Sequence, residues 1–222
     1  VEIALYDLKA QLAAVPLNQL LGGGPGLLST NLTISVNDPV TMISDAQKAV
    51  TLGYQQLKLK VGTDVQQDIK TVIAVSRAIP AHIKLRLDAN QGWTAKQSIY
   101  ALSQIEQAGV ELELVEQPVK ANDIAGLAAV TAAVYTPVMA DESSFGPREV
   151  IELIKMRAAD IINIKLMKTG GIANAIKIAD ICSFYDMQCM IGCMLEGSVS
   201  VAAAVHVAVA KSDVITKIDL DG

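Results

Sequence analysis

Three acidic residues end successive apolar runs of the chain, and this pattern suggests a site for a hard metal ion. Asp88 ends the run IKLRLD, Glu116 ends LELVE and Asp141 ends PVMAD. Carboxylates gathered at one edge would repel one another strongly unless a cation lay among them. Ligation by oxygen alone is typical of Mg²⁺, which usually keeps places for water or substrate. We therefore predict a Mg²⁺ site at these acids, with three solvated strand ends as the alternative.

Lysines end the apolar runs on either side of the acidic trio. Lys58 and Lys60 lie two residues apart in LKLKVG, and Lys165 ends IINIK. A neighbouring ammonium group and a dry site both disfavour a protonated lysine, which suits Lys60 to act as a base. In an eight-stranded barrel, Lys60 on strand two and Lys165 on strand six would face each other. We expect them to remove a proton from one face of a substrate and return it to the other.

The regular spacing of these residues indicates the elements that position them. The steps from Lys60 to Asp88, Asp88 to Glu116 and Glu116 to Asp141 are 28, 28 and 25 residues. One strand, one helix and two short loops need roughly this length. Ligand-binding residues collect at the carboxyl ends of parallel strands. The spacing therefore predicts a βα repeat that brings the acids and lysines to one rim.

The hydrophobic pattern predicts eight strands that alternate with helices. The predicted strands are Leu32–Val36, Gln56–Val61, 83–88, Leu112–Gln117, Pro137–Ala140, Ile161–Lys165, Met187–Cys193 and Val214–Leu220. The predicted helices are Val1–Leu21, Thr41–Gly53, Asp64–Ile79, Thr94–Gly109, Asp123–Tyr135, Pro147–Arg157, Gly171–Tyr185 and Ser198–Ala210. Right-handed crossovers between such units close into a barrel. We predict an α/β fold, a parallel (β/α)7β TIM-like barrel, with an open doubly wound sheet as the alternative.

Length and composition favour one domain over residues 1–222, with an N-terminal helix at 1–22 and the eight strands within 32–222. A hydrophobic fraction of 51% predicts a large core, and no Pro-, Ser- or Gly-rich linker interrupts the repeat. No apolar run reaches the roughly 20 residues that span a bilayer, and no signal segment opens the sequence. We expect a cytoplasmic location and no membrane partner.

The net charge and the cysteine content further limit the possible classes of partner and ligand. The net charge of −5 argues against nucleic acid as a partner. The apolar outer helices favour association into a homo-oligomer. Cys182, Cys189 and Cys193 lie in apolar contexts without zinc-ligand spacing, so we expect buried, reduced thiols.

Taken together, the motifs resemble the enolase superfamily, in particular its muconate-cycloisomerase-like branch and the dipeptide epimerases of the L-Ala-D/L-Glu type. The resemblance rests on ALYDL…PLNQLLGG, KLKVG, LRLDANQGW, VEQP, MADES, NIKLMKTGGI and DLDG. It implies the C-terminal barrel domain of that superfamily. Family members also carry an N-terminal α+β capping domain and a C-terminal return segment, which are absent from these 222 residues. We expect the capping domain of the same polypeptide as a partner.

The resemblance also implies roles for individual residues. The implied Mg²⁺ ligands are Asp88, Glu116 and Asp141. The implied acid/base residues are Lys60 and Lys165, with Lys58 modulating Lys60. The implied supporting groups around the site are Asn90 and Asn163. Mg²⁺ with a neighbouring lysine can stabilise the enediolate that forms when a proton α to a carboxylate is removed.

Two acids near the end of the chain bear on the substrate. Asp219 and Asp221 lie two residues apart, which places both on one face of the last strand. In the resembled dipeptide epimerases an Asp-x-Asp at this place binds the free α-ammonium group of the substrate, and two carboxylates suit one cationic amine. We therefore expect epimerisation of a dipeptide at the α-carbon of its C-terminal residue. Glu196 and Ser198 are expected at the same rim, and we assign no function to them.

Three alternatives to dipeptide epimerisation remain open from the sequence. Within the superfamily, an o-succinylbenzoate synthase, a muconate cycloisomerase or an N-acylamino acid racemase would use the same acids and lysines on substrates without a free amine. Outside it, a Schiff-base aldolase would use one lysine covalently. A non-catalytic binding barrel would keep the acidic trio only by chance.

Overall fold

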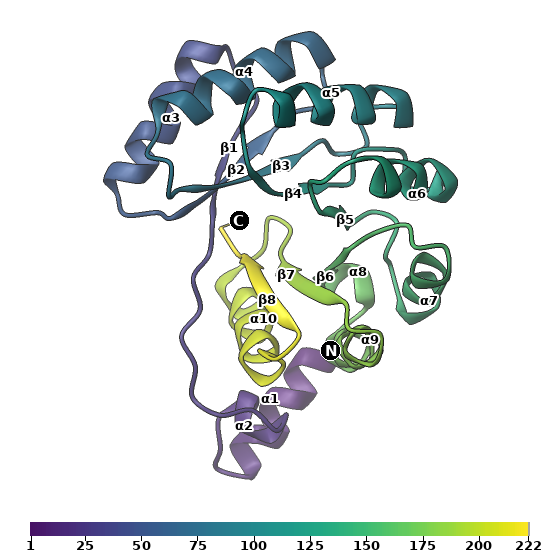
Figure 1. Ribbon diagram of the computed structural model, residues 1–222. Coiled ribbons are helices and arrows are strands. Elements are labelled where there is room, and N and C mark those ends of the chain that lie inside the picture. Colours follow the sequence, from purple (N-terminus) through teal and green to yellow (C-terminus); the bar gives the residue numbers. More distant parts are fainter. Residues whose placement is uncertain (222) are drawn as a thin grey trace. The chain divides into compact units, whose positions relative to one another are not determined.

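The computed structural model describes residues 1–221 and shows strands alternating with helices along the chain (Figure 1). The strands are β1 (Leu32–Ile34), β2 (Gln56–Lys60), β3 (Lys84–Asp88), β4 (Leu112–Glu116), β5 (Val138–Ala140), β6 (Ile161–Lys165), β7 (Gln188–Gly192) and β8 (Ile215–Asp219). The helices are α1 (Glu2–Leu12), α2 (Leu17–Leu20), α3 (Pro39–Thr51), α4 (Val65–Ala78), α5 (Ala95–Gln107), α6 (Ile124–Ala133), α7 (Pro147–Lys155), α8 (Leu166–Thr169), α9 (Ile172–Phe184) and α10 (Ser198–Ala210). The strands follow one another in the sheet in sequence order.

The helix starts that differ from the predictions have local causes. The predicted helix over Val1–Leu21 is wrong, because it is two helices separated at Ala14, whose φ is +53°, and at Pro16, which has no N–H to donate. α3 begins two residues before its predicted start. There Asp38 accepts hydrogen bonds from the N–H groups of Val40 and Thr41, and a proline follows it at the first helical position.

The chain forms two compact units. Unit 2 comprises Asn31–Ser143 and Glu152–Ile161 and contains β1 to β5, which are paired in parallel. α3, α4 and α5 lie side by side along the strands of this unit (Figure 1). Leu57, Leu59 and Leu87 are fully buried. Because they alternate with the polar strand residues, the helices and the polar site use opposite faces of the strands.

A buried arginine connects four strand regions of unit 2 at their amino ends. The Arg86 side chain is 1% exposed; its Nε donates to Glu113 Oε2 over 2.6 Å, and one of its terminal nitrogens donates to Asn31 Oδ1 over 2.6 Å. Its other terminal nitrogen lies 3.1 Å from Gln56 Oε1. Charge-assisted hydrogen bonds of this kind offset the cost of burying a guanidinium group. They also hold β2 to β4 in the register that aligns their carboxyl ends.

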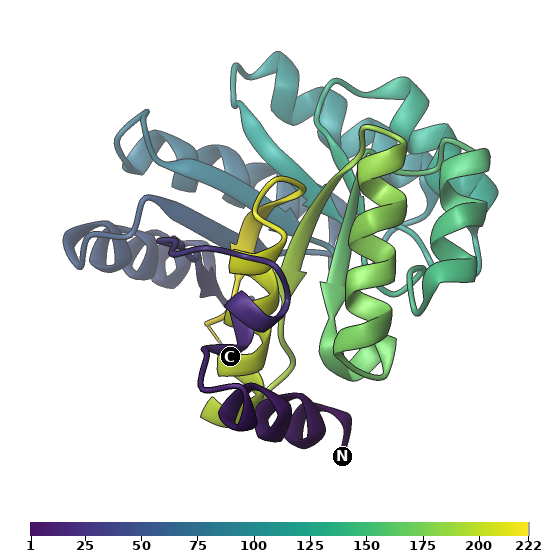
Figure 2. The same cartoon turned by 90° about the horizontal axis from the view of Figure 1, so that it is seen from below.

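Unit 1 comprises Val1–Thr30, Ser144–Ile151 and the residues from 162 onward. β7 and β8 pair in parallel, and the N-terminal helices, purple in Figure 2, lie beside α10. Glu2 of α1 accepts a hydrogen bond from the N–H of Ala173 in the first turn of α9. A carboxylate is stabilising at that end of a helix. This contact ties α1 to the segment that follows β6.

The prediction of buried cysteines is confirmed for two of the three residues. Cys182 and Cys189 are buried and free, whereas Cys193 is partly exposed. A hydrogen bond with Cys182, together with burial, raises the pKa of Cys189 above its ordinary value and keeps it protonated.

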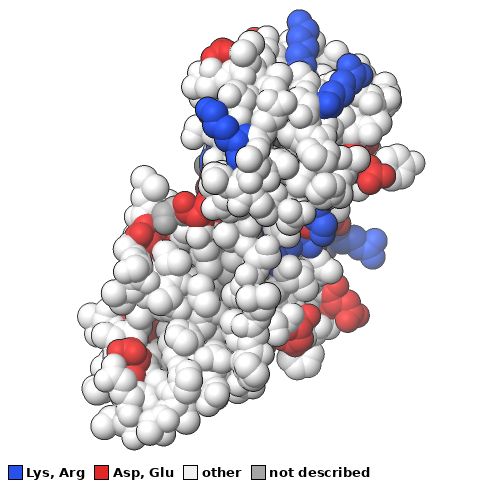
Figure 3. Space-filling view, turned by 90° about the vertical axis from the view of Figure 1, so that its left-hand side faces the viewer, with Lys and Arg blue, Asp and Glu red and all other residues white. Residues whose placement is uncertain are grey.

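Two surface properties match the composition. On the face drawn in Figure 3, charged side chains are scattered among uncharged ones. None of the helices within residues 1–221 combines the length and the hydropathy that crossing a membrane requires.

Candidate active site

The register of unit 2 brings three of the predicted site residues side by side. Lys60 pairs with Asp88 across β2 and β3, and Asp88 pairs with Glu116 across β3 and β4. Paired residues of neighbouring strands lie about 5 Å apart. Asp88 is 1% exposed and Glu116 is fully buried. Two carboxylates are therefore held next to each other away from solvent.

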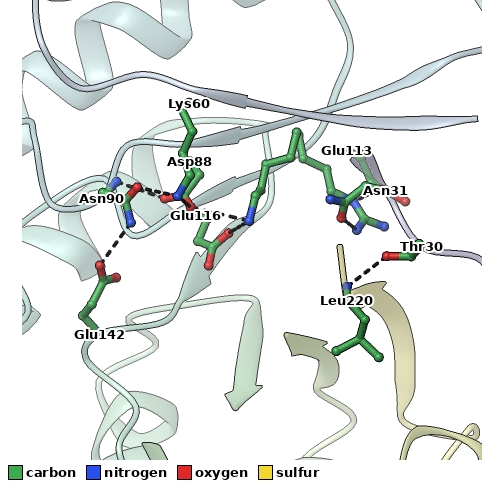
Figure 4. A network of polar contacts seen from close by, with 11 residues as sticks. Thr30, Asn31, Lys60, Asp88, Asn90, Glu113, Glu116, Glu142 and Leu220 are labelled. Atoms are coloured by element: carbon green, nitrogen blue, oxygen red, sulfur yellow. Dashed lines mark hydrogen bonds and ion pairs between the residues drawn. The ribbon is translucent and has the colours of Figure 1, made fainter. Parts of the chain in front are cut away.

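Two lysine ammonium groups lie against these carboxylates (Figure 4). Lys60 Nζ lies 2.6 Å from Asp88 Oδ2 and donates to Asn90 Oδ1 over 2.6 Å. Lys58 Nζ lies 3.7 Å from Asp88 Oδ2 and 3.9 Å from Glu116 Oε2. A buried carboxylate without a countercharge costs several kcal/mol even after relaxation. The ammonium groups offset that cost here.

Asp141 follows β5 and is positioned through a glutamine that the sequence predictions did not identify. Asp141 is 2% exposed, and its backbone N–H donates to Gln117 Oε1 over 2.9 Å. The same oxygen accepts from the N–H of Ser143 over 3.1 Å, and Gln117 Nε2 donates to Ser143 Oγ over 2.8 Å and to the carbonyl of Val119 over 3.0 Å. The buried Gln117 amide thus uses its full capacity of two donated and two accepted bonds. It fixes the loop that carries Asp141.

Asn90 connects Lys60 to a second residue that the predictions missed. The Asn90 N–H donates to Asp88 Oδ1 over 3.0 Å, and Asn90 Nδ2 donates to Glu142 Oε1 over 3.3 Å (Figure 4). Asn90 has a φ of +42°, a conformation that asparagine tolerates better than most residues. Gln117 and Glu142 each directly follow a predicted ligand, in VEQP and MADES. A polar residue next to an acidic strand end was the available signal for both.

The three acids suit Mg²⁺ by their chemistry. Asp88, Glu116 and Asp141 are buried oxygen donors that follow successive strands. As the side chains stand in residues 1–221, no three His, Cys, Asp or Glu groups are gathered closely enough to hold a metal ion. Lys58 and Lys60 contact carboxylate oxygens that a metal ion would use. The donor set fits Mg²⁺, and binding would require these ammonium groups to give up those contacts.

Unit 1 carries the other predicted site residues. Asn163 is fully buried and Lys165 is 8% exposed, both on β6. Asp219 ends β8 and is 3% exposed, whereas Asp221 lies beyond the strand and is exposed. The strand ends one residue earlier than predicted, and the prediction that both acids lie on one face of it is wrong for Asp221. Because Lys60 and Lys165 belong to different units, their placement on opposite sides of a substrate stays a prediction.

Comparison with protein families and curated relatives gives concordant matches. The family described as "Enolase C-terminal domain-like" matches residues 41–221. An L-Ala-D/L-Glu epimerase of Clostridium acetobutylicum is 56% identical over 222 residues, which is 100% of this chain and 62% of the relative.

Solved structures of epimerases are also similar to this chain. The substrate-liganded complex of the L-Ala-D/L-Glu epimerase from Bacillus subtilis matches with a TM-score of 0.96 and 47% identity, over 99% of this chain and 61% of that one. A dipeptide epimerase from Enterococcus faecalis, complexed with Mg and the dipeptide L-Leu-L-Tyr, matches with a TM-score of 0.95 and 47% identity, over 99% and 62%. These matches confirm the predicted fold class, a parallel (β/α)7β TIM-like barrel. The chain spans about three fifths of the length of these relatives.

Proposed function

Because the chain belongs to the enolase C-terminal domain-like family, we propose that it is the catalytic domain of a Mg²⁺-dependent dipeptide epimerase. The observation that carries the proposal is the buried array of β2 to β4, in which Lys60 contacts Asp88 and Lys58 lies within 4 Å of both Asp88 and Glu116. The similarity to relatives named as epimerases, 56% and 47% identical, supports the same assignment.

The proposed chemistry is proton transfer at the α-carbon of the C-terminal residue of the dipeptide. Lys60 and Lys165 would each hold or accept the α-proton at Nζ, one for each epimer, and Lys58 would add positive charge beside Lys60. Asp88, Glu116 and Asp141 would hold Mg²⁺, with Asn90 and Asn163 as supporting groups. When bound, Mg²⁺ supplies positive charge that offsets the second negative charge developing on the substrate carboxylate.

The substrate class rests on the two acids at the end of the chain. Asp219 is buried at the end of β8, where it pairs in register with Gly192 of β7, and the following N–H, that of Leu220, donates to Thr30 Oγ1 over 2.9 Å. A fixed carboxylate in this place suits a substrate ammonium group. We assign Asp219 and Asp221 to the free amine of the dipeptide.

The wider setting of the domain belongs to the same proposal. Residues 1–222 would act as one catalytic domain, together with a capping domain of the same polypeptide. The protein would be cytoplasmic and would form a homo-oligomer. Apolar side chains exposed on α1, including Leu5 and Leu12, support an association surface.

The test is a dipeptide library incubated in D₂O with the full-length protein. We expect deuterium to enter the α-carbon of the second residue of L-Ala-L-Glu or a related dipeptide, and chelation of divalent metal to stop the exchange. Lys60→Ala and Lys165→Ala should each abolish epimerisation. Turnover of N-acylamino acids but of no dipeptide would replace the assignment with a racemase of the same superfamily. Covalent trapping of substrate by borohydride would replace it with a Schiff-base aldolase.

A further inference from the structure

The backbone conformation at Gly192 does not explain why this position is a glycine. It ends β7, is buried, and its φ lies outside the left-handed region that favours glycine. A glycine inside a strand weakens the strand and often marks a place where another group approaches closely. The reason for this glycine should therefore lie in its surroundings.

Two predicted site residues fill the place where a side chain would stand. A Cβ added to Gly192 would lie 2.9 Å from Asn163 Oδ1, 3.1 Å from Lys165 Cε and 3.3 Å from Asn163 Nδ2. The first distance is shorter than van der Waals contact allows, and the second requires the lysine stem to move. Both neighbours come from β6 and are themselves buried, so their movement away from an added methyl group would take place among packed side chains.

The glycines of the chain differ in what an added Cβ would meet. A Cβ on Gly24 or on Gly197 would have no neighbour within 4 Å, whereas one on Gly62 would lie 2.3 Å from the backbone oxygen of Ala89. At Gly192 the nearest atoms belong instead to the side chains of two predicted site residues, Asn163 and Lys165. Gly192 also pairs in register with Asp219, so it lies on the strand between the one carrying Lys165 and the one carrying Asp219.

We propose that Gly192 is a positioning residue, whose missing side chain leaves the space in which the Lys165 stem lies and thereby places the Lys165 ammonium group. This inference rests on the proposed function of Lys165 as one of two bases. Alanine at this position would displace Lys165 Cε and the Asn163 amide, because the three atoms nearest to the added Cβ all belong to β6. The proton transfer assigned to Lys165 would be slowed, and the one assigned to Lys60 would not.

The test compares α-proton exchange of the two epimers, L-Ala-L-Glu and L-Ala-D-Glu, in D₂O with the full-length protein. Exchange without inversion needs only the base that faces a given epimer. We expect Gly192→Ala to slow the exchange of one epimer about 10- to 100-fold, as for a displacement of a catalytic group by about 1 Å, and to leave the other nearly unchanged. The slowed epimer should be the one that Lys165→Ala also slows, and not the one that Lys60→Ala slows.

A matched control and a second variant keep the outcome interpretable. Gly24→Ala adds the same methyl group at an exposed site without neighbours and should leave both exchange rates unchanged. If Gly192→Ala does not fold, the same substitution is introduced into the Asn163→Ala protein. That background lacks the 2.9 Å contact with Asn163 Oδ1 and keeps the contact with Lys165 Cε. The double variant is then compared with Asn163→Ala alone.

Equal slowing of both epimers, or no slowing of either, would overturn the role of Gly192 while the proposed function stands. Absence of exchange in the unmodified protein would instead overturn the proposed function itself.

Discussion

At the scale of single residues, the central feature is the pairing of buried carboxylates with lysine ammonium groups. Lys60 Nζ lies 2.6 Å from Asp88 Oδ2 (Figure 4). Lys58 Nζ lies within 4 Å of both Asp88 and Glu116. Removing either partner of a buried ion pair typically costs about 3 to 5 kcal/mol. These pairs therefore hold a polar interior in place at the carboxyl ends of the strands, where the proposed chemistry needs it.

Gln117 offers a test of how the supporting residues act. Gln117→Ala would leave the buried N–H groups of Asp141 and Ser143 without their acceptor. We expect a loss of about 1 to 3 kcal/mol in the free energy of unfolding. We also expect Mg²⁺ affinity to fall about 10- to 100-fold, because the loop that carries Asp141 loses its anchor.

Urea unfolding and Mg²⁺ titration of the full-length protein measure the two effects. Gln107→Ala, at an exposed position at the end of α5, is the matched control and should change neither. Unchanged stability and unchanged Mg²⁺ affinity in Gln117→Ala would contradict an anchoring role.

At the scale of elements, the loops after β2 and β3 are packed against each other and tied to α4. Gly62 has a φ of +104°, and a Cβ there would lie 2.3 Å from the carbonyl oxygen of Ala89. Asp68 of α4 accepts hydrogen bonds from the N–H of Gly62 over 2.9 Å and from Trp93 Nε1 over 3.1 Å. One carboxylate thus connects a helix to the two loops that follow the strands of Lys60 and Asp88.

Asp68 predicts a pH dependence of stability. Burial raises the pKa of the Asp68 carboxyl above its ordinary value of 3.8, against the lowering effect of its hydrogen bonds with Gly62 and Trp93. An acid with a raised pKa in the folded state contributes stability that is fully present below the unfolded-state pKa and is lost as the pH rises through the folded-state value. We therefore expect the stability of the unmodified protein, relative to Asp68→Asn, to fall as the pH rises through this range.

Urea unfolding of both proteins at a series of pH values, from the ordinary carboxyl pKa upward, gives this difference directly. Asp45→Asn removes one negative charge from a partly exposed site on α3, where Asp45 pairs with Lys48, and controls for the change in net charge. A stability difference that does not change with pH, or that grows as the pH rises, would refute the expectation.

At the scale of the whole molecule, the acids and lysines come from strands that are far apart in the sequence. Each of them nevertheless occupies the same position in its βα repeat, at the end of a strand. Lys60, Asp88 and Glu116 are 28 residues apart in turn, and each is the last residue of its strand. The fold therefore gathers charge that no local segment contains. A metal ion that binds such a set should stabilise the folded chain as a whole.

Metal removal tests this directly in the full-length protein. Mg²⁺ at about 100 times its dissociation constant would stabilise the folded state by about 2.7 kcal/mol, and a domain of this size gains about 2 to 4 °C in Tm per kcal/mol. We expect addition of chelator to lower the Tm accordingly. Asp88→Asn should lose this response, and Lys165→Ala should keep it. The proposed metal site would be excluded by a Tm that is the same with Mg²⁺ and with chelator.

The sequence alone determined the order and type of most elements, because their causes are local. β6 and α10 have their predicted bounds, and Thr94 and Asp123 cap the helices that they were expected to begin. The alternation along β3 placed Asp88 at a strand end with Leu87 on the opposite face, as the structure shows. The helix break near Pro16 was missed, since apolar residues at helical spacing continue through it.

Only the tertiary structure decided how residues far apart in the chain support one another. Gln117 holds Asp141 across 24 residues, and Gly192 gives room to Lys165 across 27. Both separations are close to one βα repeat, but the repeat does not show which side chains meet, because that depends on the register of neighbouring strands and on the space between particular side chains. Local patterns set which face of a strand a residue occupies, and packing between strands sets what that residue meets there.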